Sequence, residues 1–212
     1  MKIYVTGLIA YETALKLYQE NKASVAARFP KFFLREFEKL SEDQPDPEVF
    51  LDNLCIEKNT KKPYSKKNYY FDGAFYIREI RDGGIFAGLW ALCEDLKKLR
   101  EEIKEQPESV ATELAQYPNI GCEIDLAAIP IDQHVVEILE LLKENPYEVS
   151  SEGSYLLVLP EEMEVQETLT EIGRIMDSKD RVIVSEDSRR YLTPPARQAK
   201  DIADRRGDHS SI

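Results

Sequence analysis

The hydrophobic residues of this chain follow two spacings that alternate along the sequence. Short apolar runs bounded by glycine, proline or charged residues are typical of buried strands. They predict strands at residues 2–9, 74–80, 119–131, 155–159 and 181–184. Apolar residues three and four positions apart predict amphipathic helices between these strands. The predicted helices are residues 10–27, a helix starting at Pro30, one starting near Pro47, one after Gly84, one after Asp132 and residues 160–176.

The alternation of strands and helices indicates the fold class. It predicts an α/β layered domain with a mixed sheet that is covered on both faces. The last predicted helix, residues 160–176, would bury one side. That side consists of Val165, Leu169, Ile172 and Met176. Asp132 is the expected N-cap of the predicted helix that starts directly after it. We expect one domain, residues 1–195, and a polar, flexible tail at residues 196–212.

Composition narrows the possible classes of function. The net charge of −12 over 212 residues disfavours general nucleic-acid binding, which needs lysine and arginine against phosphates. No apolar run is long enough for a membrane span and no signal sequence opens the chain, so we expect a cytoplasmic protein. Cys55, Cys93 and Cys122 are widely spaced, make no metal pattern, and are expected to be free thiols.

One segment, residues 57–70, departs from the acidic character of the chain. It contains five lysines among aromatic residues: Lys58, Lys61, Lys62, Lys66 and Lys67. Two interpretations are open, a solvated loop and a docking surface for an acidic partner.

A glycine pair, Gly83–Gly84, joins the predicted strand at 74–80 to the next helix. One interpretation is a tight turn that starts the helix. The other is an anion site, because free N–H groups and the positive end of the helix dipole meet at such a turn. The residues of this candidate site are Gly83, Gly84, Ile85, Arg81 and Arg78. Alternation along the strand would let only one of the two arginines reach the loop, and Asp82 would oppose an anion there.

Four motifs occur in an order that resembles a known family. They are "GGIFAGLWAL", "GCEIDLAAIPI", "NPYEVSSEGSYLLV" and "RVIVSEDSRRYLTPP". In this order they resemble the C-terminal domain of the aminoimidazole-ribonucleotide (AIR) synthase superfamily, and HypE-like hydrogenase maturation factors in particular. The resemblance implies a three-layer α/β/α sandwich with a mixed sheet. It also implies insertions near residues 57–71 and 97–117.

The resemblance further implies where a site would be. In the family, ATP and its metal are held largely by an N-terminal domain, which these residues do not resemble. We therefore predict no cofactor and no metal for this chain. The family's His-Asp-x-Thr-x-Gly-Gly turn corresponds to residues 78–84, where the His and Thr are replaced. Glu12 matches a family glutamate. The residues that would line the cleft between the two domains are Glu12, Asp82, Ser151, Glu152 and Gly153.

No residue has the neighbours that catalysis requires. His134 and His209 lack the companions of a zinc site or a catalytic dyad. Three hypotheses follow: a non-catalytic binding or accessory protein that forms a homodimer or docks on a partner; one half of a split ATP-dependent enzyme acting on a phosphorylated small molecule; and a ligand sensor using the Gly83–Gly84 loop.

Overall fold

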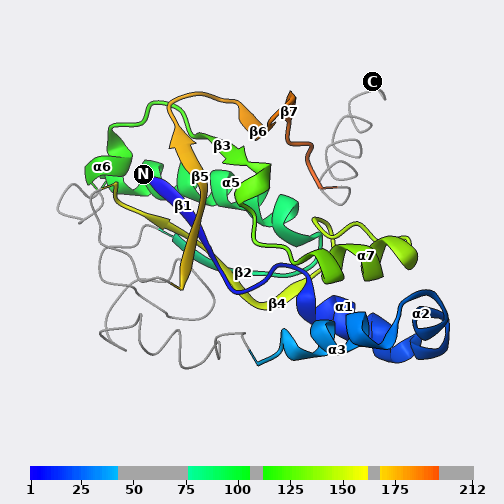
Figure 1. Cartoon of the computed structure of the whole chain (residues 1–212). Coiled ribbons are helices and arrows are strands. Elements are labelled where there is room, and N and C mark those ends of the chain that lie inside the picture. The colour runs from blue at the N-terminus through cyan, green and yellow to red at the C-terminus, as the bar shows by residue number, and fades with distance from the viewer. Residues whose placement is uncertain (43–75, 106–111, 162–167, 196–212) are drawn as a thin grey trace, which may run out of the picture.

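The computed structural model describes residues 1–42, 76–105, 112–161 and 168–195 (Figure 1). The predicted helix near Pro47, the lysine-rich segment, the insertion at 57–71 and the tail lie outside these residues. No helix of the described residues is long and apolar enough to cross a membrane.

A mixed seven-stranded sheet forms the centre of the fold. Its strand order is β2-β4-β1-β5-β3-β6-β7. The strands are β1 (Lys2–Thr6), β2 (Tyr76–Ile80), β3 (Gly121–Asp125), β4 (Ser151–Leu159), β5 (Leu169–Met176), β6 (Arg181–Ser185) and β7 (Ser188–Tyr191). Only β3 and β6 pair in parallel, and the other neighbours are antiparallel. The predicted mixed sheet is confirmed.

The described helices gather behind the sheet and at one of its ends (Figure 1). They are α1 (Tyr11–Glu20), α2 (Lys22–Arg28), α3 (Lys31–Lys39), α5 (Gly84–Glu105), α6 (Thr112–Ala115), the short 3-10 helix η1 (Leu126–Ala128) and α7 (Gln133–Leu141). Helix α7 begins as predicted, because the Asp132 carboxylate accepts a hydrogen bond from the His134 N–H at 2.8 Å.

The main core lies between the sheet and α5. Alternate residues of the central strands, such as Ile3 and Val5 of β1 and Leu156 and Val158 of β4, join the same core as Leu89 of α5. The intervening residues of β4 are buried as well, so this strand is apolar on both faces. That pattern agrees with a sheet covered on both sides.

The prediction of a helix at residues 160–176 is wrong for its last eight residues, which form β5. The error comes from the spacing of the buried side chains. Leu169, Ile172 and Ile175 are buried three residues apart, which imitates one face of a helix. In the structure, Ile172 and Ile175 belong to the main core, whereas Leu169 does not.

A β-bulge produces this spacing. Ile3 pairs with Gly173 but the next residue, Tyr4, pairs with Glu171, so Ile172 is an extra residue on β5. An extra residue shifts the alternation of side chains by one position. The strand therefore cannot show the period of two that would have identified it.

Three further predicted elements have different boundaries. The helix expected over residues 10–27 is divided at Asn21 into α1 and α2. The Asn21 side-chain amide donates to the Leu17 carbonyl at 2.9 Å and so caps the end of α1. The strand expected over 155–159 begins earlier, at Ser151, and in its first part Gly153 has a φ of 80° and the pairing with β2 shifts register. The strand expected over 119–131 is shorter, because it turns into η1 after Asp125.

Candidate functional site

The predicted loop lies where β2 ends and α5 begins. Gly83 and Gly84 both have positive φ, 81° and 62°. Glycine adopts this region without strain, whereas other residues pay a steric cost. A Cβ atom on Gly84 would lie 2.7 Å from the carbonyl oxygen of Val149 and still closer to that of Tyr147. Gly84 therefore lets the start of α5 pack directly on the backbone that precedes β4.

Several N–H groups at the start of α5 already have partners. The Gly84 N–H donates to the Arg81 carbonyl at 2.9 Å, and the Phe86 N–H donates to the Tyr147 carbonyl at 3.3 Å. The Ala87 N–H donates to the Gly83 carbonyl at 3.2 Å. The Gly84 donor that the anion interpretation requires is thus engaged, and binding there would have to break its turn hydrogen bond. These contacts favour the turn interpretation, and the anion site stays a prediction.

The two arginines of the candidate site point to different partners. Arg81 pairs with Glu79 at 2.5 Å, and Arg78 pairs with Asp95 of α5 at 3.0 Å. The hydroxyl of Tyr76 also lies 3.3 Å from the Asp95 carboxylate, and burial raises the pKa of this phenol well above its usual value. Each arginine therefore has a carboxylate that an incoming anion would have to displace.

Glu79 was not among the site residues predicted from the sequence, yet it contacts two of them. One of its carboxylate oxygens accepts a hydrogen bond from the Gly153 N–H at 3.3 Å, and the other pairs with Arg81. Glu79 thus ties the bulged start of β4 to the loop before α5. The resemblance could have identified this residue, because Glu79 corresponds to the Asp of the His-Asp-x-Thr-x-Gly-Gly turn.

The remaining candidate residues lie around the start of α1. Ser151 is buried, and its hydroxyl accepts a hydrogen bond from the Ala10 N–H at 2.8 Å. Thr13 donates to the carbonyl of Ser150 at 2.7 Å. Glu12 and Glu152 are exposed. The structure therefore brings Ser151, Gly153, Glu79 and Arg81 to one end of the sheet, where their contacts hold β2, β4 and α1 together.

A second polar cluster joins β6 to α5. Arg181 of β6 is only 6% exposed, its guanidinium lies 3.8 Å from the centre of the Trp90 ring, and it pairs with Glu94 of α5. Burial acts to raise the pKa of Glu94, but hydrogen bonds from Lys97 and Arg181 outweigh it and lower that pKa. This arrangement stabilises a charge that burial alone would disfavour.

Two free cysteines adjoin this cluster. Cys122 of β3 lies directly opposite Arg181 in the register of the sheet, and Cys93 precedes Glu94 on α5. Both thiols are free, as expected from the sequence, and both are buried, while Cys55 lies outside the described residues. A hydrogen bond from Cys122 lowers the pKa of Cys93, while the same bond and burial raise that of Cys122.

The described residues contain no cluster of three or more His, Cys, Asp or Glu side chains that could hold a metal ion. His134 contacts Asp132 at 2.7 Å and the ring of Phe33, with ring centres 4.5 Å apart. Its surroundings are those of a helix cap packed on an aromatic side chain. His209 lies outside the described residues.

Comparison with known proteins identifies the fold. No protein-family model and no curated protein matches the sequence. Among solved structures, a HypE in complex with ATP is 15% identical with a TM-score of 0.52, over 92% of this chain and 50% of that one. E. coli HypE is 15% identical with a TM-score of 0.53, over 92% and 49% of the two chains. The structure of a HypE–HypF complex is 13% identical with a TM-score of 0.50, over 92% and 52%. The chain thus spans about half the length of these proteins and is similar in fold to the hydrogenase maturation protein HypE, as the sequence motifs predicted.

Proposed function

We propose that residues 1–195 form a single binding or accessory domain, which self-associates or docks on another polypeptide and does not itself catalyse a reaction. The observation that carries this proposal is the exposed edge of the sheet at β7. All four residues of Ser188–Tyr191 are exposed, and Tyr191 is 70% exposed. Within the described residues, β7 pairs with β6 alone.

The outer edge of β7 offers backbone groups for pairing. Leu192 donates its N–H to the Arg181 carbonyl at 2.8 Å, directly after β7. Because hydrogen bonding alternates along an antiparallel strand, the N–H groups of Arg189 and Tyr191 point away from β6. An edge strand with free N–H groups and an exposed aromatic side chain is suited to pairing with another strand.

The similar proteins supply independent support. One of the similar structures is a complex of HypE with HypF, so a protein of this fold binds a protein partner. The present chain corresponds to only half of such a protein. Both observations support docking of the present chain on another polypeptide.

Light scattering after size exclusion tests self-association. We expect the purified chain to be larger than its monomer mass of 24.4 kDa and to dissociate on dilution. Tyr191→Lys puts a charge on the edge strand and should shift the population toward monomer. Phe32→Lys is the matched control, because Phe32 is a similarly exposed aromatic residue, 61%, on α3. A monomer at all concentrations with no partner, or an equal effect of both variants, would contradict the assignment to β7.

A second candidate is one half of a split ATP-dependent enzyme. The observation behind it is that the chain matches half of a HypE solved with ATP. If the other half of a HypE-like protein holds the nucleotide, the present chain alone should give no heat on titration with Mg–ATP. Hydrolysis should then appear only after addition of a separately produced N-terminal half. Micromolar ATP binding by the chain alone would contradict both candidates.

A further inference from the structure

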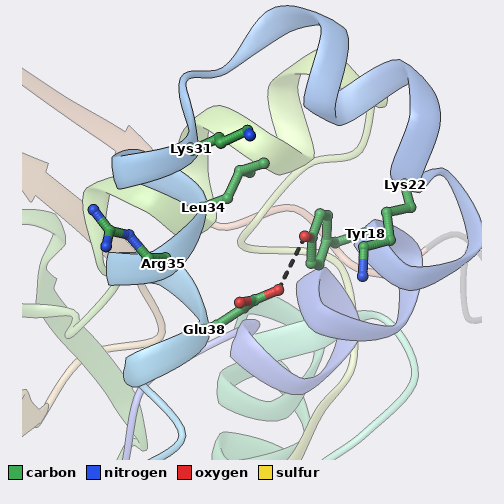
Figure 2. Close-up of a pocket in the computed structure, with 6 residues that line it drawn as sticks. All are labelled: Tyr18, Lys22, Lys31, Leu34, Arg35 and Glu38. Carbon is green, nitrogen blue, oxygen red and sulfur yellow. Dashed lines mark hydrogen bonds between the residues drawn. The ribbon is translucent and has the colours of Figure 1, made fainter.

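A pocket lies between the first three helices (Figure 2), and none of its lining residues belongs to the loop before α5. Its volume is about 440 Å³, which is in the range of small-molecule sites. It is lined by Tyr18, Lys22, Lys31, Leu34, Arg35 and Glu38. The pocket is open to solvent, so a ligand could enter it without a rearrangement of the helices.

The charge of the pocket is opposite to that of the chain. The chain carries a net charge of −12, whereas the lining has three cations and one carboxylate. Lys22 projects from α2 beside Tyr18, and Lys31 and Arg35 come from α3 (Figure 2). Lys22 lies 5.8 Å from the centre of the Tyr18 ring.

Two of these cations have no ion-pair partner among the described residues. Lys31 and Arg35 are exposed and are four residues apart on α3. Like charges at this spacing repel each other on a helix. Lys39, on the same helix, is by contrast paired with Glu36 at 2.9 Å. An anion placed between the unpaired cations would remove their repulsion.

The floor of the pocket is apolar. Tyr18 and Leu34 are 3% and 8% exposed, and the Tyr18 ring packs edge-on against Phe37. The Tyr18 hydroxyl donates to Glu38 at 3.0 Å, and burial followed by this hydrogen bond raises the pKa of the phenol. Tyr18 therefore remains a neutral donor to Glu38, the one carboxylate of the pocket lining.

We propose that this pocket binds a small organic anion in which a phosphate or carboxylate group is attached to an aromatic ring or short apolar group. The ring lies on the floor formed by Tyr18 and Leu34. The anionic group lies at the rim, which is lined by Lys22 of α2 and by Lys31 and Arg35 of α3. This site is separate from the β7 edge and does not depend on the function proposed above.

The probe for this site is phenyl phosphate, titrated into isotopically labelled full-length protein and followed by amide chemical shifts. We expect saturable shifts confined to residues 11–39. Inorganic phosphate and benzyl alcohol, which each carry half of the probe's chemistry, should bind more weakly than phenyl phosphate. The double variant Lys22→Gln/Lys31→Gln should weaken binding by about tenfold or more, because two charge-assisted contacts are lost. Lys16→Gln is the matched control, since Lys16 is exposed on α1 outside the pocket.

Each contrary outcome overturns a stated part of the proposal. Shifts that do not saturate, or that spread over the whole chain, would show that no built site exists. Equal weakening by the Lys16 control would show general charge attraction. An acidic peptide that shifts the same residues while phenyl phosphate does not would replace the small molecule with a protein ligand. Light scattering of the variants should be unchanged, so failure here leaves the β7 test intact.

Discussion

Replacing Gly84 with alanine tests whether the glycine pair serves packing or anion binding. Gly84 has a φ of 62°, and a non-glycine residue there costs about 1–2 kcal/mol. The added Cβ would also lie 2.7 Å from the Val149 carbonyl oxygen and would force the segment before β4 away from α5. Loss of the hydrogen bond from Phe86 to Tyr147 would cost about 1 kcal/mol more. We therefore expect Gly84→Ala to lower the free energy of unfolding by about 2–3 kcal/mol.

Urea denaturation followed by circular dichroism measures this loss. The matched control is Gly88→Ala on the same helix, whose added Cβ would meet only the flexible end of Leu156 at 2.8 Å. Because alanine favours a helix interior over glycine by about 1 kcal/mol, the control should change stability by no more than about that amount. A loss below about 1 kcal/mol for Gly84→Ala would refute the close packing of α5 on the backbone before β4.

The same pair of variants tests the anion interpretation. If Gly84 serves packing alone, phosphate should not raise the midpoint of thermal unfolding of the wild-type protein. A midpoint that rises with phosphate in the wild type and in Gly88→Ala, but not in Gly84→Ala, would instead support an anion site at this turn.

Two further predictions concern buried polar contacts. Glu94→Gln should destabilise the fold by about 1–2 kcal/mol, less than for a fully buried pair because Glu94 is 40% exposed. The pKa of Glu94 is lowered in the folded state. Its contribution to the free energy of unfolding is therefore present above the usual glutamate pKa and is lost as pH falls through the lowered value. The difference in stability between wild type and variant, measured by urea titration, should shrink from about pH 7 to about pH 3. A difference that is constant with pH would contradict this. Ser151→Ala leaves the buried Ala10 N–H without its acceptor and should cost about 1–3 kcal/mol, whereas Ser150→Ala should be neutral because Thr13 bonds only the backbone there. Equal thermal midpoints for these two serine variants would show that the Ser151 hydroxyl is not required.

The sequence by itself determined the fold class and most of the elements. Apolar runs and helical spacing located five of the seven strands approximately and the helices α3, α5 and α7, because the main core is built from these local patterns. The motifs at 83–92 and 121–131 correctly indicated a HypE-like fold. Local chemistry also predicted the cap at Asp132, since an N-cap bond needs only neighbouring residues.

Only the tertiary structure decided features that depend on residues far apart in the chain. β5 was predicted as a helix because its bulge, set by pairing with β1, hides the alternation of a strand. The Glu79–Gly153 contact joins positions 74 residues apart, and the pocket beside Tyr18 combines side chains of three helices. The cations predicted to serve the glycine loop are neutralised by Glu79 and Asp95. The sequence shows which charged residues are present, but which of them form ion pairs depends on distances that only the folded chain sets.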